Sequence, residues 1–124
     1  MADVIYHIAL VADWDAAVSA GDYRISTLGR TLQQEGFLHF CRTPEQLTGV
    51  AERYYAGVTD PLCLLTVDTG LLPLPIVDES PAPGVAELFP HLYAPLPVSA
   101  VIRVTPLSRD ASGVLGPLPS GREV

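Results

Sequence analysis

The chain of 124 residues contains no lysine, only two cysteines and no long apolar segment. Without lysine, a Schiff-base enzyme or a lysine general base is excluded, and arginine is the only cationic side chain for a phosphate or a carboxylate. No apolar run reaches the roughly 18 residues that cross a bilayer. Cys41 and Cys63 form no CxxC pair and are expected to be reduced core residues. The N-terminus lacks the basic and apolar regions of a signal peptide, so we expect a cytoplasmic protein.

The formal net charge of −7 also excludes a class of partners. It argues against non-specific binding to nucleic acid and against an anionic membrane surface. Apolar residues make up 48% of the chain and charged residues 17%, which together with the length favours one compact globular domain. The partner that we expect is therefore a small molecule or a nucleotide.

Alternating and continuous apolar patterns indicate how the chain is organised. They predict strands over Val4–Leu10, Phe37–Cys41, Leu62–Val67, Ile76–Glu79 and Val98–Leu107, and a short extended piece over Tyr23–Ser26. Asp13 is expected to cap a helix over Trp14–Ala20 that ends at Gly21. Thr43, with Pro44 and Gln46, shows the capping-box pattern of a second helix. Residues 27–35 are compatible with a helical turn or an ordered loop.

This order of elements predicts the fold class. We expect an α+β fold: a single domain over residues 1–107, with a mostly antiparallel sheet and two or three helices. A doubly wound nucleotide fold would need regular alternation and a Gly-rich turn after the first strand, and neither is present. Residues 108–124 are polar, contain Gly and Pro, and are predicted to form a flexible tail.

Three histidines, His7, His39 and His91, are the strongest functional signal. Each lies beside an aromatic residue in an apolar stretch, where a buried imidazole needs a hydrogen-bond partner, a ligand or a metal. Three interpretations follow: a shared ligand pocket, three hydrogen-bonded core histidines, or a catalytic zinc site. A fourth is a thiolate–imidazole nucleophile, since Cys41 shares a strand face with His39, although no third group orients that pair.

Several segments resemble the DUF952 family of small, largely bacterial proteins. The resemblance covers residues 4–107 and rests on Ile5-Tyr6-His7-Ile8, Trp14 to Gly21 with Tyr23, Ser26 and Leu28, Glu35 to His39, Thr43 to Gln46 and Phe89 to Leu96. Two positions depart from the family pattern. Ala94 stands where glycine is usual, and Phe40-Cys41-Arg42 stands where a Cys-Ser or similar pair commonly follows the histidine.

The family in turn is similar to a minimal ADP-ribosyltransferase-like fold, in the branch of rifampin ADP-ribosyltransferase and the RNA 2′-phosphotransferases. In that branch a histidine of the first strand contacts the ribose or nicotinamide of NAD, and His7 is the matching residue. The resemblance therefore implies NAD as a cofactor and ADP-ribosyl or glycosyl transfer as the activity.

Such a transfer needs a positioned ribose, an aromatic wall and a carboxylate near the ribose. The expected ligand-binding residues are His7, Tyr23, Arg24, Arg30, His39, His91 and Tyr93, and the expected catalytic carboxylates are Glu35 and Glu79. In these roles His7 holds the ribose, a tyrosine stacks and an arginine meets the pyrophosphate. The alternative is a non-catalytic module that binds a small ligand in the same pocket. A carboxylate within hydrogen-bond reach of His7 would favour transfer; its absence would favour binding.

Overall fold

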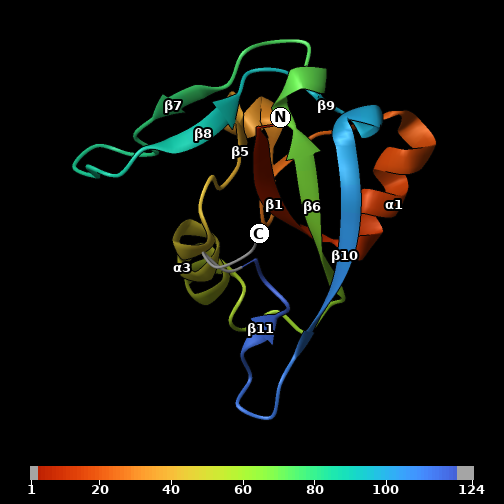
Figure 1. Ribbon diagram of the computed structural model, residues 1–124, viewed down its shortest axis with the longest axis vertical. Helices are drawn as coiled ribbons and strands as arrows, with labels where there is room; N and C mark the ends of the chain where they lie inside the picture. Colours follow the sequence, from red (N-terminus) through yellow and green to blue (C-terminus); the bar gives the residue numbers. More distant parts are fainter. Residues whose placement is uncertain (1–2, 120–124) are drawn as a thin grey trace.

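A four-stranded antiparallel sheet forms the centre of the molecule in the computed structural model, which describes residues 3–119 (Figure 1). Its strands, in spatial order, are β1 (Val4–Leu10), β6 (Leu62–Asp68), β10 (Val101–Arg109) and β11 (Leu115–Gly116). Strand β6 pairs with β1 on one edge and with β10 on the other. Its continuous apolar sequence fits this central position, because most of its side chains on both faces are buried.

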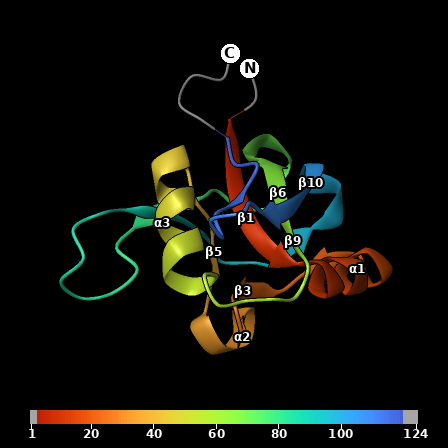
Figure 2. The same ribbon diagram turned by 90° about the horizontal axis from the view of Figure 1, so that it is seen from below.

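Three smaller antiparallel sheets complete the strands: β5–β8–β7, β2–β9 and β3–β4. Their bounds are β2 Asp22–Tyr23, β3 Ile25–Thr27, β4 Arg30–Thr31, β5 Leu38–His39, β7 Val77–Glu79, β8 Phe89–Leu92 and β9 Leu96–Pro97. The loop between β7 and β8 projects away from the central sheet in both views (Figures 1 and 2).

The described residues contain three α-helices and two short 3₁₀ turns. They are α1 (Val11–Ala20), α2 (Leu32–Glu35), α3 (Pro44–Tyr54), η1 (Thr69–Leu71) and η2 (Val98–Ala100). The predicted start of α3 is confirmed, since the Thr43 side chain accepts from the backbone N–H of Gln46. The Gln46 side chain instead accepts from the backbone N–H of Arg42, one residue before the expected partner. None of the described helices has the length and apolar composition of a membrane span.

The start of α1 differs from the prediction. The helix begins at Val11, directly after β1, and its N-cap Leu10 contributes no side-chain hydrogen bond. Asp13 therefore lies in the first turn, where a carboxylate favours the helix dipole without capping it. Gly21 ends the helix as predicted, with a left-handed φ of 97° that glycine adopts without strain.

The ambiguous residues 27–35 contain both a strand and a helix. Strands β3 and β4 form a small hairpin, and α2 follows at once. Thr31 and Gln34 cap α2 reciprocally, each side chain bonding the other residue's backbone N–H. This capping box stabilises a helix too short for its own apolar periodicity to reveal.

The C-terminal boundary also differs from the prediction. Residues Val98–Ala100 form η2, and β10 then runs through Arg109, so the boundary expected after residue 107 falls inside a strand. Ser108 and Arg109 pair with β11, and Leu115 is only 7% exposed. Residues 108–119 thus belong to the domain; the remainder of the predicted tail, 120–124, lies outside the described residues.

Two buried clusters lie on the two faces of β1. Ile5 and Ala9 belong to the cluster that includes Ala17 of α1, whereas Ile8 belongs to the cluster that includes Leu47 of α3. Helices α1 and α3 accordingly lie on opposite sides of β1 in both views (Figures 1 and 2). The α+β class, with a mostly antiparallel strand arrangement in one small domain, is confirmed.

Candidate functional site

The three histidines converge where β1 meets the β5–β8 pair. The register of β5 and β8 places His39 opposite His91. Strand β1 reaches them through Nδ1 of His7, which lies 2.7 Å from the carbonyl oxygen of His39. All three are buried and hydrogen-bonded, as the core interpretation expects, and they are also linked to one another, through the His39 carbonyl and the ring nitrogens of His39 and His91.

His7 is the inner end of this group and has both ring nitrogens engaged. Nδ1 faces the His39 carbonyl, so it carries the hydrogen; Nε2, 3.0 Å from the Tyr23 hydroxyl, accepts from it. Burial lowers the pKa of His7 to about 4, partly opposed by the bond to the His39 carbonyl, and burial raises the pKa of Tyr23. His7 is thus a neutral imidazole held by two protein groups, and neither nitrogen is left for a ribose.

The other two histidines continue to the surface as a chain of hydrogen bonds. His39 Nδ1 lies 3.3 Å from His91 Nε2, and His91 Nδ1 lies 2.9 Å from Glu79 Oε1. The Tyr93 hydroxyl donates to the same carboxylate oxygen. His91 is 1% exposed, whereas Tyr93 is 47% exposed. We call Glu79, His91 and His39 the histidine chain; it runs from a solvated carboxylate to a buried imidazole.

Aromatic rings fix the imidazoles of the histidine chain. Phe37 stacks on His91 with ring centroids 3.9 Å apart and planes 15° apart. Phe89 lies against His39, with centroids 4.9 Å apart. These ring contacts disfavour rotation of the imidazoles that would break the hydrogen bonds.

The electrostatics of the histidine chain place the negative charge at its outer end. Burial, together with the neighbouring His91 and His7, lowers the pKa of His39 to about 3. Hydrogen bonds from Tyr93 and His91 lower the pKa of Glu79, so its carboxylate is ionised. The bond between Tyr93 and Glu79 also raises the pKa of Tyr93.

The remaining predicted site residues lie apart from the histidine chain. Arg24 pairs with Asp22 at 3.0 Å, and Arg30 pairs with Glu35 at 2.6 Å, both on the surface. These are exposed ion pairs of the β2 and β4–α2 region. The structure thus brings together His7, Tyr23, His39, Glu79, His91 and Tyr93, and it leaves Arg24, Arg30 and Glu35 outside.

The two alternative chemistries gain no support. Burial raises the pKa of Cys41 to about 12, so its sulfur is a thiol rather than the thiolate that a nucleophile requires. Within residues 3–119 no group of three or more histidine, cysteine or acidic side chains is arranged to share a metal ion.

A narrow crevice lies at the inner end of the histidine chain, beside β1. It has a volume of about 10 Å³ and is lined by Tyr6, His7, Ile8, Ser26, Thr27, His39, Cys41, Val50 and Tyr55. The Ser26 hydroxyl is fully buried and has no hydrogen-bond partner among the described residues. The space is about that of one water molecule, far too small for a nucleotide.

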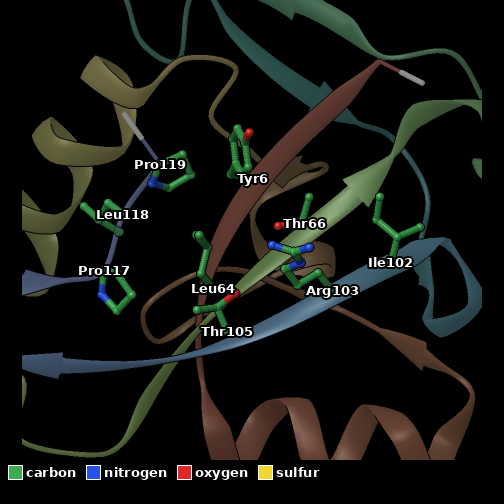
Figure 3. A pocket seen from close by; sticks show the side chains of 9 residues that line it. All are labelled: Tyr6, Leu64, Thr66, Ile102, Arg103, Thr105, Pro117, Leu118 and Pro119. Carbon is green, nitrogen blue, oxygen red and sulfur yellow. The ribbon is translucent and has the colours of Figure 1, made fainter. Parts of the chain in front are cut away.

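A much larger groove of about 540 Å³ lies across the face of β1, β6 and β10. The sheet contributes Tyr6, Leu64, Thr66, Ile102, Arg103 and Thr105, and the segment Pro117, Leu118 and Pro119 forms one wall (Figure 3). The Arg103 guanidinium lies over the sheet beside Thr66 (Figure 3). Among the described residues it makes no ion pair or side-chain hydrogen bond, unlike Arg24, Arg30, Arg42 and Arg109.

None of the predicted site residues lines this groove, yet the sequence carried a signal for it. Arg103 and Thr105 are polar residues at alternate positions of an otherwise apolar strand, on one face as predicted. Ile102, expected on the opposite face, lines the groove with them. A bulge between Val101 and Arg103 inserts one extra residue and breaks the alternation there.

These features define a small α+β domain with a buried histidine–carboxylate chain and a separate groove across its sheet. The polypeptide belongs to the family described as protein of unknown function (DUF952), whose model matches residues 8–104. It is similar to protein CC0527 from Caulobacter crescentus. The crystal structure of that protein is 35% identical over 91% of this chain and 93% of that one, with a TM-score of 0.75. Its solution NMR structure is 37% identical over 90% of each chain, with a TM-score of 0.71. None of the curated proteins matches the chain.

Proposed function

We propose that this domain binds a small anionic, nucleotide-like ligand in the groove across β1, β6 and β10. The observation that carries the proposal is Arg103, the only charged side chain among the described residues that line the groove. Its guanidinium offers a bidentate site for a phosphate, in a chain whose net charge of −7 would otherwise repel one. The volume of about 540 Å³ lies within the roughly 300–1,000 Å³ of ordinary ligand pockets.

The other lining groups suit the body of such a ligand. The Thr66 and Thr105 hydroxyls can bond phosphate or ribose oxygens beside Arg103. The Tyr6 ring and the Pro117–Pro119 wall offer apolar surface on which a base can pack. The site therefore combines one charge, two hydroxyls and an aromatic ring, which matches a nucleotide better than a purely apolar ligand.

NAD and ADP-ribosyl or glycosyl transfer remain part of the proposal as its finer form, which the ADP-ribosyltransferase-like resemblance implies. A cytoplasmic location also remains a proposal, which rests on the N-terminal sequence. Two observations favour binding alone over transfer. His7, the residue that would hold the ribose, has the His39 carbonyl and Tyr23 as partners, and no carboxylate of residues 3–119 is hydrogen-bonded to it. The described lining of the groove also contains no carboxylate to stabilise charge at an anomeric carbon.

Calorimetric titration with AMP, ADP-ribose, NAD and adenosine tests the proposal. We expect the three phosphate-bearing ligands to bind and adenosine to bind at least tenfold more weakly. Arg103→Gln should weaken AMP about tenfold or more, because hydrogen bonds to a charged group contribute roughly 1.5–3 kcal/mol. Arg53→Gln is the matched control: Arg53 is an exposed arginine in the last turn of α3 and should leave binding unchanged.

Two results would contradict the proposal: no binding by any of the four compounds, or equal affinities for the two arginine variants. Incubation with NAD separates the two forms of the proposal. Release of free nicotinamide would favour transfer, and intact NAD together with binding would favour the non-catalytic module.

A further inference from the structure

The histidine chain forms an unbroken path between the surface and the crevice at Ser26. Its outer end is Glu79, whose side chain is 34% exposed, and its middle is His91, whose side chain is 1% exposed. Its inner end is His39, which also lines the crevice. Groups that lie far apart in the sequence are therefore joined by hydrogen bonds of 2.9 and 3.3 Å.

The polarity of the path follows from the ionised carboxylate. Glu79 can only accept, so His91 Nδ1 carries a hydrogen; in the neutral form of the His91 ring, Nε2 then has a free lone pair. His39 Nδ1 must then donate to that lone pair, which leaves His39 Nε2 as the acceptor at the inner end. Within the described residues this nitrogen has no hydrogen-bond partner. Every link points toward Glu79.

His39, the inner residue of the histidine chain, lines a space in which a proton donor fits. The crevice, about 10 Å³, suits one water molecule or the hydroxyl group of a larger molecule. Ser26 supplies a fully buried hydroxyl that no described group satisfies. An unsatisfied buried polar group costs on the order of 1–3 kcal/mol, so such a group is uncommon outside functional sites.

We propose that Glu79, His91 and His39 form a proton relay that takes a proton from a hydroxyl group in the crevice. His39 Nε2 accepts the proton and leaves the donor as an oxyanion, while the hydrogen on His39 Nδ1 passes to His91 Nε2. His91 becomes an imidazolium whose Nδ1–H stays bonded to the Glu79 carboxylate. In total, one proton has moved from the crevice at the inner end to His91 near the surface. His39 has changed from its Nδ1–H to its Nε2–H tautomer and stays neutral, and no co-reactant is needed.

The relay accounts for a basic function at a buried imidazole. Alone, His39 is a poor base, because burial and its neighbours His91 and His7 lower its pKa. The proton does not stay on His39. It rests on His91, whose Nδ1–H is bonded to the ionised Glu79 carboxylate. Phe37 and Phe89, which pack against the two rings, are uncharged, and so is the Cys41 thiol, which lines the crevice together with His39. Asp78, next to Glu79, is paired with Arg42.

Long-range ¹H–¹⁵N correlation of histidine rings in the full chain tests the relay. At pH 7.5 we expect His91 and His39 both as the Nδ1–H tautomer. On acidification His91 should become doubly protonated, and His39 should switch to Nε2–H at the same midpoint. Glu79→Gln removes the charge with little change of shape and should lower this midpoint by about one pH unit or more. Glu87→Gln, on the same β7–β8 connection but bonded to Gln46, is the control and should leave it unchanged.

Three results would overturn the relay: an Nε2–H tautomer for either histidine at pH 7.5, a His39 tautomer that stays fixed while His91 titrates, or equal midpoints in the two glutamate variants. The first of these is read in the native chain at neutral pH, so it holds even if acid unfolds the protein. A merely structural hydrogen bond would not couple the two tautomers. The measurement needs no ligand in the groove, so its outcome is independent of the proposed function.

Discussion

Tyr6 and His7 are neighbours on β1, and their side chains serve opposite faces of the same strand. Tyr6 lines the open groove together with Arg103, a cation without a partner among the described residues. His7 is buried, and both of its ring nitrogens bond protein groups. The groove face therefore has polar groups that can bind a ligand. On the His7 face almost every polar group is already hydrogen-bonded to another protein group.

The difference shows why histidines in apolar stretches are ambiguous as site markers. A buried imidazole must be satisfied, and in this fold the protein itself supplies the partners. An exposed arginine costs little without a partner, so a free guanidinium in a groove is the better indicator of an external anion. We therefore expect changes in the histidine group to act on stability, and changes in the groove to act on binding.

Acidification should produce the largest change in the free energy of unfolding, and this change should come from the buried histidines and not from the groove. The pKa is about 4 for folded His7 and about 3 for folded His39, below the ordinary 6.5, so the unfolded chain binds protons first as the pH falls. The contribution of the two neutral histidines to the free energy of unfolding is complete above pH 6.5. It is lost as the pH drops from 6.5 toward the pKa values of the folded state. Between pH 7.5 and 5 we expect about 2 kcal/mol lost per histidine, measured by urea unfolding.

Most carboxylates remain ionised over this range, so the loss can be assigned to the histidines. Arg103→Gln should show the same pH profile as the native chain. A flat stability between pH 7.5 and 5 would mean that His7 and His39 are not held neutral, and the contrast between the two faces would fail.

The next largest effect is expected for His7→Ala. The variant removes a buried ring, leaves the Tyr23 hydroxyl and the His39 carbonyl without their partner, and opens a cavity in the core. We expect a loss of roughly 2–4 kcal/mol in the free energy of unfolding at pH 7.5. Arg103→Gln, on the other face, should change it by less than about 0.5 kcal/mol.

Equal stabilities for these two variants would show that His7 is not a structural residue. The NAD hypothesis would then regain its ribose contact, because a histidine that contributes nothing to the fold is free to serve a ligand. Calorimetric titration of the His7 variant with NAD would decide that point.

Some of this organisation could be predicted from local sequence. Strand β1, the start of α3 and the buried β6 have strong periodic or capping signals, and the structure confirms them. The partners of His91 could not be predicted, because they come from β5 and β7 through strand pairing between residues far apart in the chain. The groove was missed for the same reason: its wall, residues 117–119, lies in a segment whose polar composition indicated a tail.

The smallest predicted effect concerns Ser26, where the contrast is between two kinds of hydroxyl. Thr66 in the groove is partly exposed, so solvent can reach its hydroxyl, and Thr66→Val should change stability by less than about 0.5 kcal/mol. Ser26 is fully buried with an unsatisfied hydroxyl. Ser26→Ala removes that cost, and we expect a gain of up to about 1 kcal/mol in the urea-unfolding free energy.

A loss of 1 kcal/mol or more for Ser26→Ala would mean that the hydroxyl has a partner in the folded protein, and a water molecule in the crevice is the candidate that the volume allows. A gain would instead show that the fold tolerates an unfavourable hydroxyl beside His39. In that case stability does not explain the serine, whereas a site that positions the hydroxyl of another molecule against the histidine chain does.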